Sequence, residues 1–361
     1  MNRGFLSHVN FSLLAPVLAL LILSLTVVFS VSASLFWNQL VFVILSIVVF
    51  LFCSNINYKI LKAYATPIYI ASLVVLLLLL FIGIESRGAV RWFEFFGFRI
   101  QFSEFMKPFL AITLASYLAE HKSQSFKTFL RVLLFLLPVV FLIFAQPDLG
   151  NALIYCFVVM FTLIVFGFPF RYFLGGLLFV GALSPIAFRF LHGYQKQRLS
   201  TFLNPSSDPL GTSYNAIQSA IAVGSGMFFG QGLGQGTQSA LRFLPERHTD
   251  FIFATTAEEL GFVGALLILV IFALLLYKIF SIFINADDTF AKVFSLTAFF
   301  IILVQLFINV GMNIGIMPIV GVTLPFVSYG GSSLLSNFIL LGILSAIDTQ
   351  GGRDKDVLEI R

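Results

Sequence analysis

The sequence has few charged residues and few cysteines, and both shortages limit the class of protein to which it can belong. Only 10% of its 361 residues are Asp, Glu, Lys or Arg, whereas about a quarter of an ordinary soluble domain is charged. A water-soluble globular protein is therefore excluded. Cys53 and Cys156 each lie in or beside an apolar run, where a small buried thiol is the usual interpretation, so no disulfide is expected.

Several motifs of soluble enzymes are missing as well. The four histidines are too scattered for a zinc site, and the chain has no Ser nucleophile elbow. The glycine-rich stretch 230–236 lacks the spacing of a nucleotide-binding loop and follows no strand. The net charge of +5 does not indicate a nucleic-acid partner, because in such a chain the placement of charge matters more than the total.

Long apolar runs are what the sequence has instead. Hydrophobic residues make up 59% of the chain, which includes 46 Phe, and the mean hydropathy is +1.01. Since roughly 20 helical residues cross a ~30 Å hydrocarbon core, we predict an all-α polytopic integral membrane protein. It forms a single transmembrane domain over residues 1–361, with about ten transmembrane helices. The predicted spans are 11–32, 37–54, 64–84, 103–120, 127–145, 148–168, 170–190, 251–280, 290–312 and 328–347.

The positions of Lys and Arg predict the orientation of these spans. Short connections assigned to the cytoplasm contain Lys59, Lys62, Lys127 and Arg171, whereas the short outer connections contain no Lys or Arg. Both termini are therefore expected in the cytoplasm, including a tail at 348–361. A large extracytoplasmic loop, residues 191–249, is expected between the seventh and eighth helices.

This outer loop contains two patterns of its own. Residues 214–223 have the spacing of an amphipathic helix that could lie in the membrane interface. The glycine-rich stretch 230–236 is either a flexible connection or a set of backbone amides that cradles a lipid phosphate. The sequence leaves these two interpretations open.

Ionisable residues at membrane depth are the first candidates for function. Glu104 and Lys107 are three residues apart at the start of the fourth span, so they can share one helix face and form an ion pair. Asp148 lies at a hairpin tip, where the simplest role is the N-cap of the sixth helix.

Asp250 immediately precedes the eighth span and allows two interpretations. Either Thr249 or Asp250 could be an N-cap. Alternatively, a carboxylate beside Arg242, Arg247 and His248 could bind a polar substrate and accept a proton.

Glu258 and Glu259 are adjacent inside the eighth span, about two turns below Asp250. We expect one of them to face a polar interior, which implies a solvated cavity. Further along, the segment around Ser328 opens the tenth helix with small residues, where backbone could approach a ligand closely.

Taken together, these motifs resemble the SEDS family of bacterial cell-wall polymerases, which includes RodA and FtsW. The short N-terminal segment and the short C-terminal tail are more similar to RodA than to FtsW. The chain departs from the family at two places. It has Phe102 before Ser103, where the family usually has Pro, and it has Thr255 and Thr256 early in the eighth helix, where aliphatic residues are common in the family. The resemblance covers most of the chain and rests on the segments 88–92, 101–104 with Lys107, 146–150, 197–199, 218–219, 230–236, 244–254, 258–261 and 324–333.

The resemblance implies a peptidoglycan glycosyltransferase that polymerises lipid II at the outer face of the cytoplasmic membrane, for cell elongation and shape. Asp250 matches the essential aspartate of the family and would act as general base, with inversion at the donor sugar. The other site residues expected to bind substrate are Arg91, Glu104, Lys107, Asp148, Arg198, Arg242, Arg247, Glu258 and Ser328.

The resemblance requires no cofactor, although a divalent cation, Mg²⁺ or Mn²⁺, could assist at Asp148 or the glutamates. It implies a class B penicillin-binding protein as partner. Two alternatives stay open: a lipid II flippase and a non-catalytic scaffold of the cell-wall synthesis complex. Neither needs Asp250 as a base.

Overall fold

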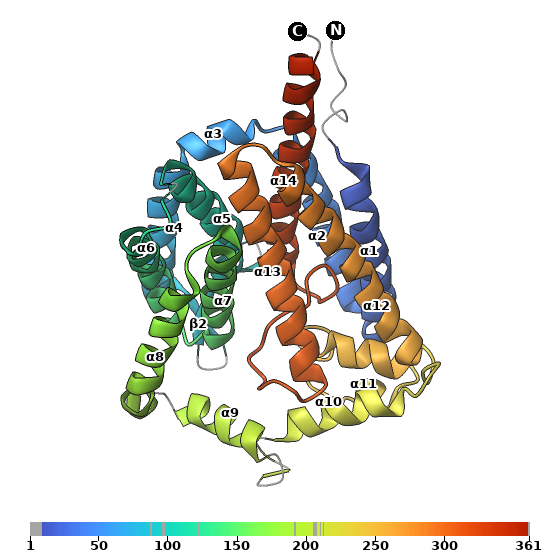
Figure 1. The fold of residues 1–361 in the computed structure, drawn as a ribbon. Coiled ribbons are helices and arrows are strands. Elements are labelled where there is room, and N and C mark those ends of the chain that lie inside the picture. Colours follow the sequence, from blue (N-terminus) through green and yellow to red (C-terminus); the bar gives the residue numbers. More distant parts are fainter. Residues whose placement is uncertain are drawn as a thin grey trace.

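The fold is a bundle of long helices with a small sheet and a layer of short helices at one end (Figure 1). The computed structural model describes residues 9–86, 89–95, 98–121, 123–190, 193–204, 208–209, 211 and 213–359, so parts of the predicted loop 191–249 and the end of the tail 348–361 lie outside the described residues. The long helices are α1 (Phe11–Val31), α2 (Ala33–Ser54), α4 (Ala65–Ile82), α5 (Phe102–Glu120), α6 (Phe126–Ala145), α7 (Leu149–Phe166), α8 (Phe170–Phe190), α12 (Ile252–Asn285), α13 (Thr289–Asn313) and α14 (Gly331–Glu359). Each of the ten predicted spans is therefore a helix.

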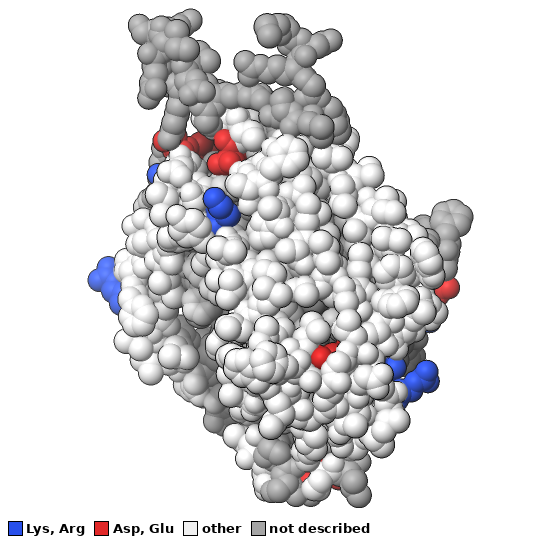
Figure 2. Space-filling view, turned by 90° about the vertical axis from the view of Figure 1, so that its right-hand side faces the viewer, with Lys and Arg blue, Asp and Glu red and all other residues white. Residues whose placement is uncertain are grey.

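Eight of these helices, within the described residues, are long and apolar enough to cross a membrane. The two others are α5, which contains the charged pair Glu104 and Lys107, and α8, whose apolar part is the shorter stretch Phe170–Ser184. The described part of the face drawn in Figure 2 is mostly uncharged, with a few scattered charged side chains, as a surface largely in contact with lipid should be. The prediction of a polytopic all-helical membrane protein is confirmed.

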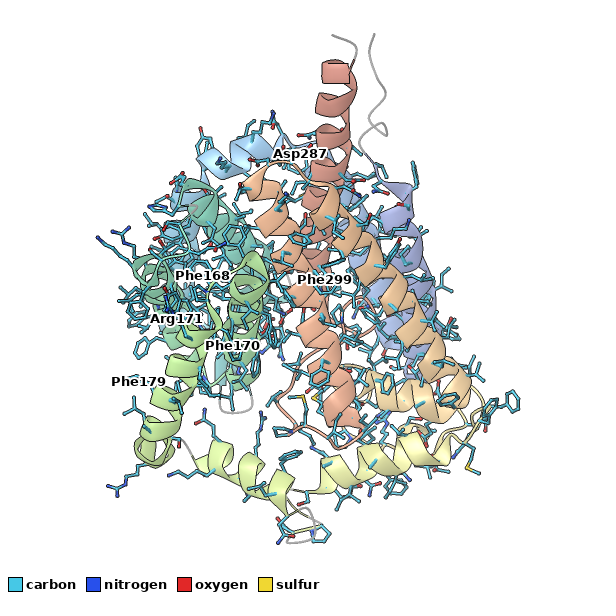
Figure 3. The ribbon with its side chains drawn as sticks, in the orientation of Figure 1. Phe168, Phe170, Arg171, Phe179, Asp287 and Phe299 are labelled. Carbon is cyan, nitrogen blue, oxygen red and sulfur yellow. The ribbon has the colours of Figure 1, made fainter. Side chains whose placement is uncertain are left out.

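Helices α13 and α14 lie in the middle of the bundle and are its most buried spans. Helix α13 packs against α5, α7 and α12, and α14 packs against α2 and α5. By contrast, α8 presents apolar side chains outward, and Phe179 on it is 65% exposed (Figure 3). Such exposure is expected where the surroundings are lipid rather than water.

A three-stranded antiparallel sheet between α4 and α5 was not predicted from the sequence. Its strands are β1 (Ile84–Ser86), β2 (Ala89–Phe95) and β3 (Phe98–Gln101), in the order β1-β2-β3. The sheet lies at the end of the bundle where α5 begins, and β2 positions Arg91 next to the loop between α6 and α7.

The four remaining helices are short and lie at the two ends of the bundle. Helix α3 (Tyr58–Ala63) lies at the end where α1 begins (Figure 1). The other three lie at the opposite end and belong to the segment between α8 and α12: α9 (Gly193–Leu203), α10 (Tyr214–Ser225) and α11 (Thr237–Ala240). Helix α10 confirms the helix predicted at 214–223; it buries Ser219 and Ala222 and leaves Ile221 exposed.

Helix α12 is interrupted by a kink at Gly261, which has a φ of 70° and a ψ of −165°. The kink removes helical hydrogen bonds, so backbone groups on both sides of it need other partners. The glycine-rich loop supplies them: Gln231 N–H donates to the carbonyl of Glu258, and Phe262 N–H donates to the carbonyl of Met227. The loop and the kink therefore form one unit.

Candidate active site

The Asp250 segment lies at the end of the bundle where α10 and α11 are found, directly before α12. Its backbone is fixed by two amides of α13, because Asn309 Nδ2 and Asn313 Nδ2 each donate to the carbonyl oxygen of Asp250 at 3.0 Å. Asn313 also accepts a hydrogen bond from Ala254 N–H at 3.0 Å. A central, buried helix thus sets the position of this aspartate.

The loop between α13 and α14 holds the same segment from the other side. Ser328 Oγ donates to the carbonyl of Thr249 at 2.7 Å and accepts from Leu324 N–H at 2.7 Å. Tyr329 N–H donates to the carbonyl of His248 at 2.8 Å. The backbone from His248 to Asp250 is therefore bonded to two different elements.

The side chain of Asp250 faces this loop at Gly321. A β-carbon added to Gly321 would lie 3.4 Å from Asp250 Oδ2, and the φ of Gly321 is 73°. A residue without a side chain is favoured there, because that φ is unfavourable for other residues. Asp250 itself is only half-buried.

The predicted N-cap role of Thr249 or Asp250 is wrong. The residue preceding the first turn of α12 is Phe251, which forms no side-chain cap. Thr249 Oγ1 instead donates to Glu246 Oε2 at 3.0 Å. Asp250 lies one residue too early, and two asparagines of α13 donate to its carbonyl.

Arg242 and Arg247 place two positive charges just before Asp250 in the chain. Burial lowers the pKa of the Arg247 guanidinium, the nearby Arg242 cation lowers it further, and Glu246 acts in the opposite direction. Arg247 Nε is buried and has no hydrogen-bond partner. Mutual repulsion and an unsatisfied donor are both relieved when an anion binds between such groups.

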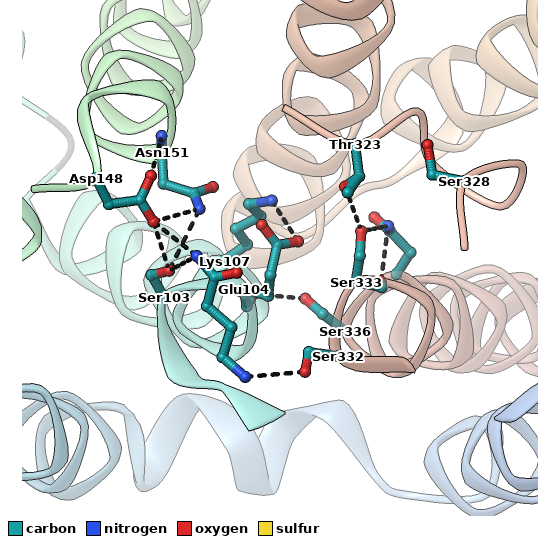
Figure 4. Close-up of polar contacts among 12 residues, drawn as sticks. Ser103, Glu104, Lys107, Asp148, Asn151, Thr323, Ser328, Ser332, Ser333 and Ser336 are labelled. Atoms are coloured by element: carbon teal, nitrogen blue, oxygen red, sulfur yellow. Dashed lines mark hydrogen bonds and ion pairs between the residues drawn. The ribbon is translucent and has the colours of Figure 1, made fainter. Parts of the chain in front are cut away.

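A second polar cluster surrounds Asp148 (Figure 4). The carboxylate caps α7 by accepting from Asn151 N–H at 3.2 Å, so the predicted N-cap is confirmed. It also accepts from Gln101 Nε2 at 2.7 Å, from Ser103 Oγ at 3.1 Å and from Asn151 Nδ2 at 2.9 Å. Asp148 is 2% exposed.

Glu104 and Lys107 form the ion pair that their spacing predicts. Lys107 Nζ lies 2.7 Å from Glu104 Oε2, and both side chains are buried. Two hydrogen bonds join this part of α5 to the start of α14: Ser336 Oγ donates to the carbonyl of Glu104, and Gln101 N–H donates to Ser332 Oγ. Figure 4 shows these contacts side by side with the Asp148 cluster.

The loop between α13 and α14 passes between the two sites. Gly150, two residues after Asp148, packs so closely on this loop that an added β-carbon would lie 2.6 Å from the carbonyl oxygen of Val320. The next residue, Gly321, is the neighbour of Asp250. Gly150 and Asp250 therefore lie against adjacent residues of the same loop.

At Glu258 and Glu259, where a solvated cavity was predicted, both side chains are buried and bonded to loop backbone. Glu258 accepts from Gln238 N–H at 2.7 Å and from Ser239 N–H at 3.0 Å. Glu259 accepts from Gly234 N–H at 3.1 Å and from Ser30 Oγ at 2.6 Å. These carboxylates anchor the outer loop to α12, and a role of Glu258 in substrate binding stays a prediction.

The glycine-rich stretch is neither a free connection nor an open anion cradle. The amides of Gln231, Gly232 and Gly234 donate to Glu258 or Glu259, and the amide of Gly230 donates to the carbonyl of Gly226. Amides that are already bonded to the protein are not available to a phosphate.

Two of the predicted cations lie farther along the same end of the bundle. Arg91 donates to the carbonyl oxygens of Gln146 at 3.1 Å and Pro147 at 2.6 Å, and so ties the sheet to the hairpin that leads to Asp148. Arg198 lies half-buried on α9. Their predicted contact with substrate stays a prediction.

The described residues do not fit a metal site. They contain no group of three His, Cys, Asp or Glu side chains that could hold a metal ion. The carboxylates proposed as ligands, Asp148, Glu258 and Glu259, already accept hydrogen bonds from protein donors. We therefore derive no step that passes through a divalent cation.

Sequence reasoning missed Asn309, Asn313 and Gly321. The signal that could have found the first two is a pair of carboxamides four residues apart in a long apolar helix, which places both on one face. Polar groups in such a helix need partners. The role of Gly321 depends on a contact between distant segments, and no local pattern indicates it.

The chain is similar to known proteins over most of its length. Residues 4–352 match the cell cycle protein family of FtsW, RodA and SpoVE. The chain is 38% identical to the peptidoglycan glycosyltransferase MrdB of Escherichia coli K12 over 348 residues, which are 95% of this chain and 94% of that protein. It is 34% identical to the stage V sporulation protein E of Bacillus subtilis, over 92% of this chain and 95% of that protein.

Two solved structures have the same fold. One is the structure reported as the structural coordination of polymerization and crosslinking by a peptidoglycan synthase complex. The chain in it that is similar to this protein has a TM-score of 0.83 and 31% identity, over 96% of this chain and 98% of that chain. The other is the rod shape determining protein RodA of Thermus thermophilus, with a TM-score of 0.73 and 28% identity, over 95% of this chain and 97% of that chain.

Proposed function

The chain belongs to the FtsW, RodA and SpoVE family and is a peptidoglycan glycosyltransferase of cell-wall synthesis, and from this premise we propose that Asp250 is the general base of its reaction. The observation that supports this role is the fixed backbone of Asp250, whose carbonyl accepts from two buried asparagines while the side chain stays half-buried. A base needs a defined position and access to its substrate.

The substrate is lipid II, an undecaprenyl-pyrophosphate-linked disaccharide pentapeptide. Asp250 removes the proton of the acceptor sugar 4-hydroxyl as its oxygen attacks the donor anomeric carbon. The β-1,4 bond forms, the bond from that carbon to the pyrophosphate oxygen breaks, and undecaprenyl pyrophosphate leaves. Attack and departure on opposite sides invert the donor configuration, and both sugars must be held in line.

Arg242 and Arg247 stabilise the charge that develops on the leaving pyrophosphate. Preorganised cations aimed at developing charge are effective in a poorly hydrated site. The unpartnered Nε of Arg247 and the repulsion between the two guanidiniums support this assignment. The Asp148 cluster lies beside Gly150, which packs on the loop that carries Gly321, and the Glu104–Lys107 pair lies where α5 is bonded to α14, so both act through position.

Membership of this family also predicts where the protein lies and which partner it binds. The protein lies in the bacterial cytoplasmic membrane with both termini in the cytoplasm, and the Asp250 end faces outward. A class B penicillin-binding protein docks on the helix surface and crosslinks the new strand. The relative found in a complex that coordinates polymerization and crosslinking supports such a partner.

The deciding experiment incubates the purified full-length protein with lipid II, with and without its co-expressed penicillin-binding protein, and resolves the glycan polymers. Asp250→Asn should reduce polymerisation by about 100-fold or more, since general base catalysis contributes about 10²–10⁴-fold. The matched control is Asp287→Asn, the same change in the connection between α12 and α13 at the other end of the bundle (Figure 3). Equal thermal stability of all variants shows that folding is not the cause.

Two results would contradict the proposal. If Asp250→Asn forms polymer at the wild-type rate, Asp250 is not the general base. Transport of lipid II across vesicles by wild type, with no polymer under any pairing, would favour a flippase over a polymerase.

A further inference from the structure

A pocket of about 460 Å³ lies at the opposite end of the bundle from Asp250, among α3, α4, α5 and α6. None of the residues that line it belongs to the sites described above. Its volume is within the range of small-molecule sites, which is about 300–1,000 Å³. The chemistry of its wall therefore indicates what it can hold.

The residues that line the pocket include two lysines and one glutamate, so the lining has more positive than negative charge. Lys59 and Lys62 line the pocket from α3, and Glu120, on the last turn of α5, is the acidic residue among its lining side chains. Among the same residues, the hydroxyl of Tyr117 is buried and has no hydrogen-bond partner. A phenol can donate to an oxygen of a bound group, and an unsatisfied buried donor is costly.

The remaining wall has an apolar part, formed by Ala63, Ala65, Tyr69 and Phe135, and also contains the hydroxyl residues Thr66, Thr113 and Ser116. Tyr69 of α4 and Phe135 of α6 stack in the pocket with ring centroids 3.9 Å apart. Their chain neighbours Ile70 and Leu134 are exposed on the outside of the same helices. A ligand in this pocket can therefore keep an apolar part in the membrane.

We propose that this pocket binds the phosphate of an anionic phospholipid, with Lys59 and Lys62 at the phosphate and Tyr117 donating to one of its oxygens. Basic pockets between transmembrane helices are suited to anionic headgroups. The apolar part of the wall, whose chain neighbours are exposed on the outside of the bundle, favours a phospholipid over a soluble phosphate.

The test measures binding of phosphatidylglycerol and phosphatidylcholine to the purified full-length protein by native mass spectrometry. Wild type should prefer phosphatidylglycerol. The double variant Lys59→Gln/Lys62→Gln should bind it roughly tenfold more weakly, since each lysine near a headgroup contributes appreciably. The charge-matched control, Lys278→Gln/Lys292→Gln, removes two lysines from α12 and α13 and should leave binding unchanged.

Two further variants keep the test decisive if the double variant does not fold. Glu120→Gln removes the negative charge of the lining and should strengthen phosphatidylglycerol binding. Tyr117→Phe should weaken it by about threefold, the value of one hydrogen bond. A general loss of folding would weaken phosphatidylglycerol binding in both variants, so stronger binding in one and weaker binding in the other is not expected from it.

Three outcomes would overturn the proposal. Equal affinity of wild type for the two lipids excludes recognition of negative charge. Stronger phosphatidylglycerol binding in the lysine variant together with weaker binding in Glu120→Gln shows that the lysines do not bind its phosphate. Displacement of phosphatidylglycerol by millimolar inorganic phosphate or glycerol phosphate, with lysine-dependent binding of those ions alone, assigns the pocket to a soluble phosphate.

Discussion

Single side chains position the reacting group of this protein, and Asn313 is the clearest case. Its amide nitrogen donates to the carbonyl oxygens of Asp250 and Asn309, and its amide oxygen accepts from Ala254 N–H. One buried carboxamide therefore sets both the Asp250 backbone and the first turn of α12.

Asn313→Asp should separate this positioning role from folding. Aspartate keeps the acceptor for Ala254 but loses the donor to Asp250, so kcat should fall roughly ten- to a hundredfold, because small misplacements of a reacting group are costly. KM for lipid II should change little. Ser295→Ala on the same helix is the control, since Ser295 Oγ is buried without a hydrogen-bond partner. A wild-type kcat in Asn313→Asp would show that Asp250 is held by other contacts.

The two arginines before Asp250 lead to a prediction about the leaving group. Inorganic pyrophosphate should inhibit polymerisation by wild type in competition with lipid II, because it satisfies Arg247 Nε and relieves the repulsion from Arg242. In Arg247→Gln its inhibition constant should rise roughly tenfold, the loss of one charge-assisted hydrogen bond. Arg171→Gln, at the start of α8, is the control. Equal inhibition of all three proteins would place the pyrophosphate elsewhere.

Among single residues, the sequence indicates the importance of the charged residues better than that of the uncharged residues that position them. Asp250, Asp148 and the pair Glu104–Lys107 are conspicuous because ionisable groups are rare in apolar surroundings. Asn313 does not stand out in this way, and its role depends on a contact between residues 63 positions apart. The sequence also predicts that Glu258 is important, but the structure shows it bonded to loop backbone where a solvated cavity was expected.

At the scale of elements, the kink of α12 and the glycine-rich loop depend on each other. Gly226 lies against the first half of α12, so closely that an added β-carbon would clash with the carbonyl of Ala257. The kink and the loop could not be predicted because each satisfies hydrogen bonds that the other leaves open. Glycine alone indicates only that the backbone is permissive.

Two glycines, two residues apart, test this unit. Gly226→Ala should destabilise the protein by about 1–3 kcal/mol, because the backbone of α12 cannot move aside easily. Gly224→Ala should stabilise it slightly, by about 0.5–1 kcal/mol, since Gly224 lies in α10 with open space around its α-carbon. Thermal unfolding in one detergent compares both with wild type. If the two variants melt at the same temperature, the loop does not pack tightly on the kink in solution.

For the molecule as a whole, composition and apolar runs were sufficient to predict the ten long helices. A 20-residue apolar run has one stable form in a bilayer, because the backbone must satisfy its own hydrogen bonds. Strands β1 to β3 lie outside the spans, where this constraint is absent, and the sequence did not indicate them. The same physics explains why the short helices α3 and α9 were not expected.

The orientation of the whole protein is the remaining prediction, and the structure makes it testable with two exposed positions. Ser123 lies between α5 and α6, and Gln235 lies in the segment between α10 and α11. Lys and Arg in the short connections place the first inside and the second outside. A membrane-impermeant maleimide should therefore label Gln235→Cys on intact spheroplasts and Ser123→Cys only after permeabilisation. Wild type, with Cys53 buried and Cys156 half-buried, gives the background. The reverse pattern would put Asp250 in the cytoplasm, away from the cell wall.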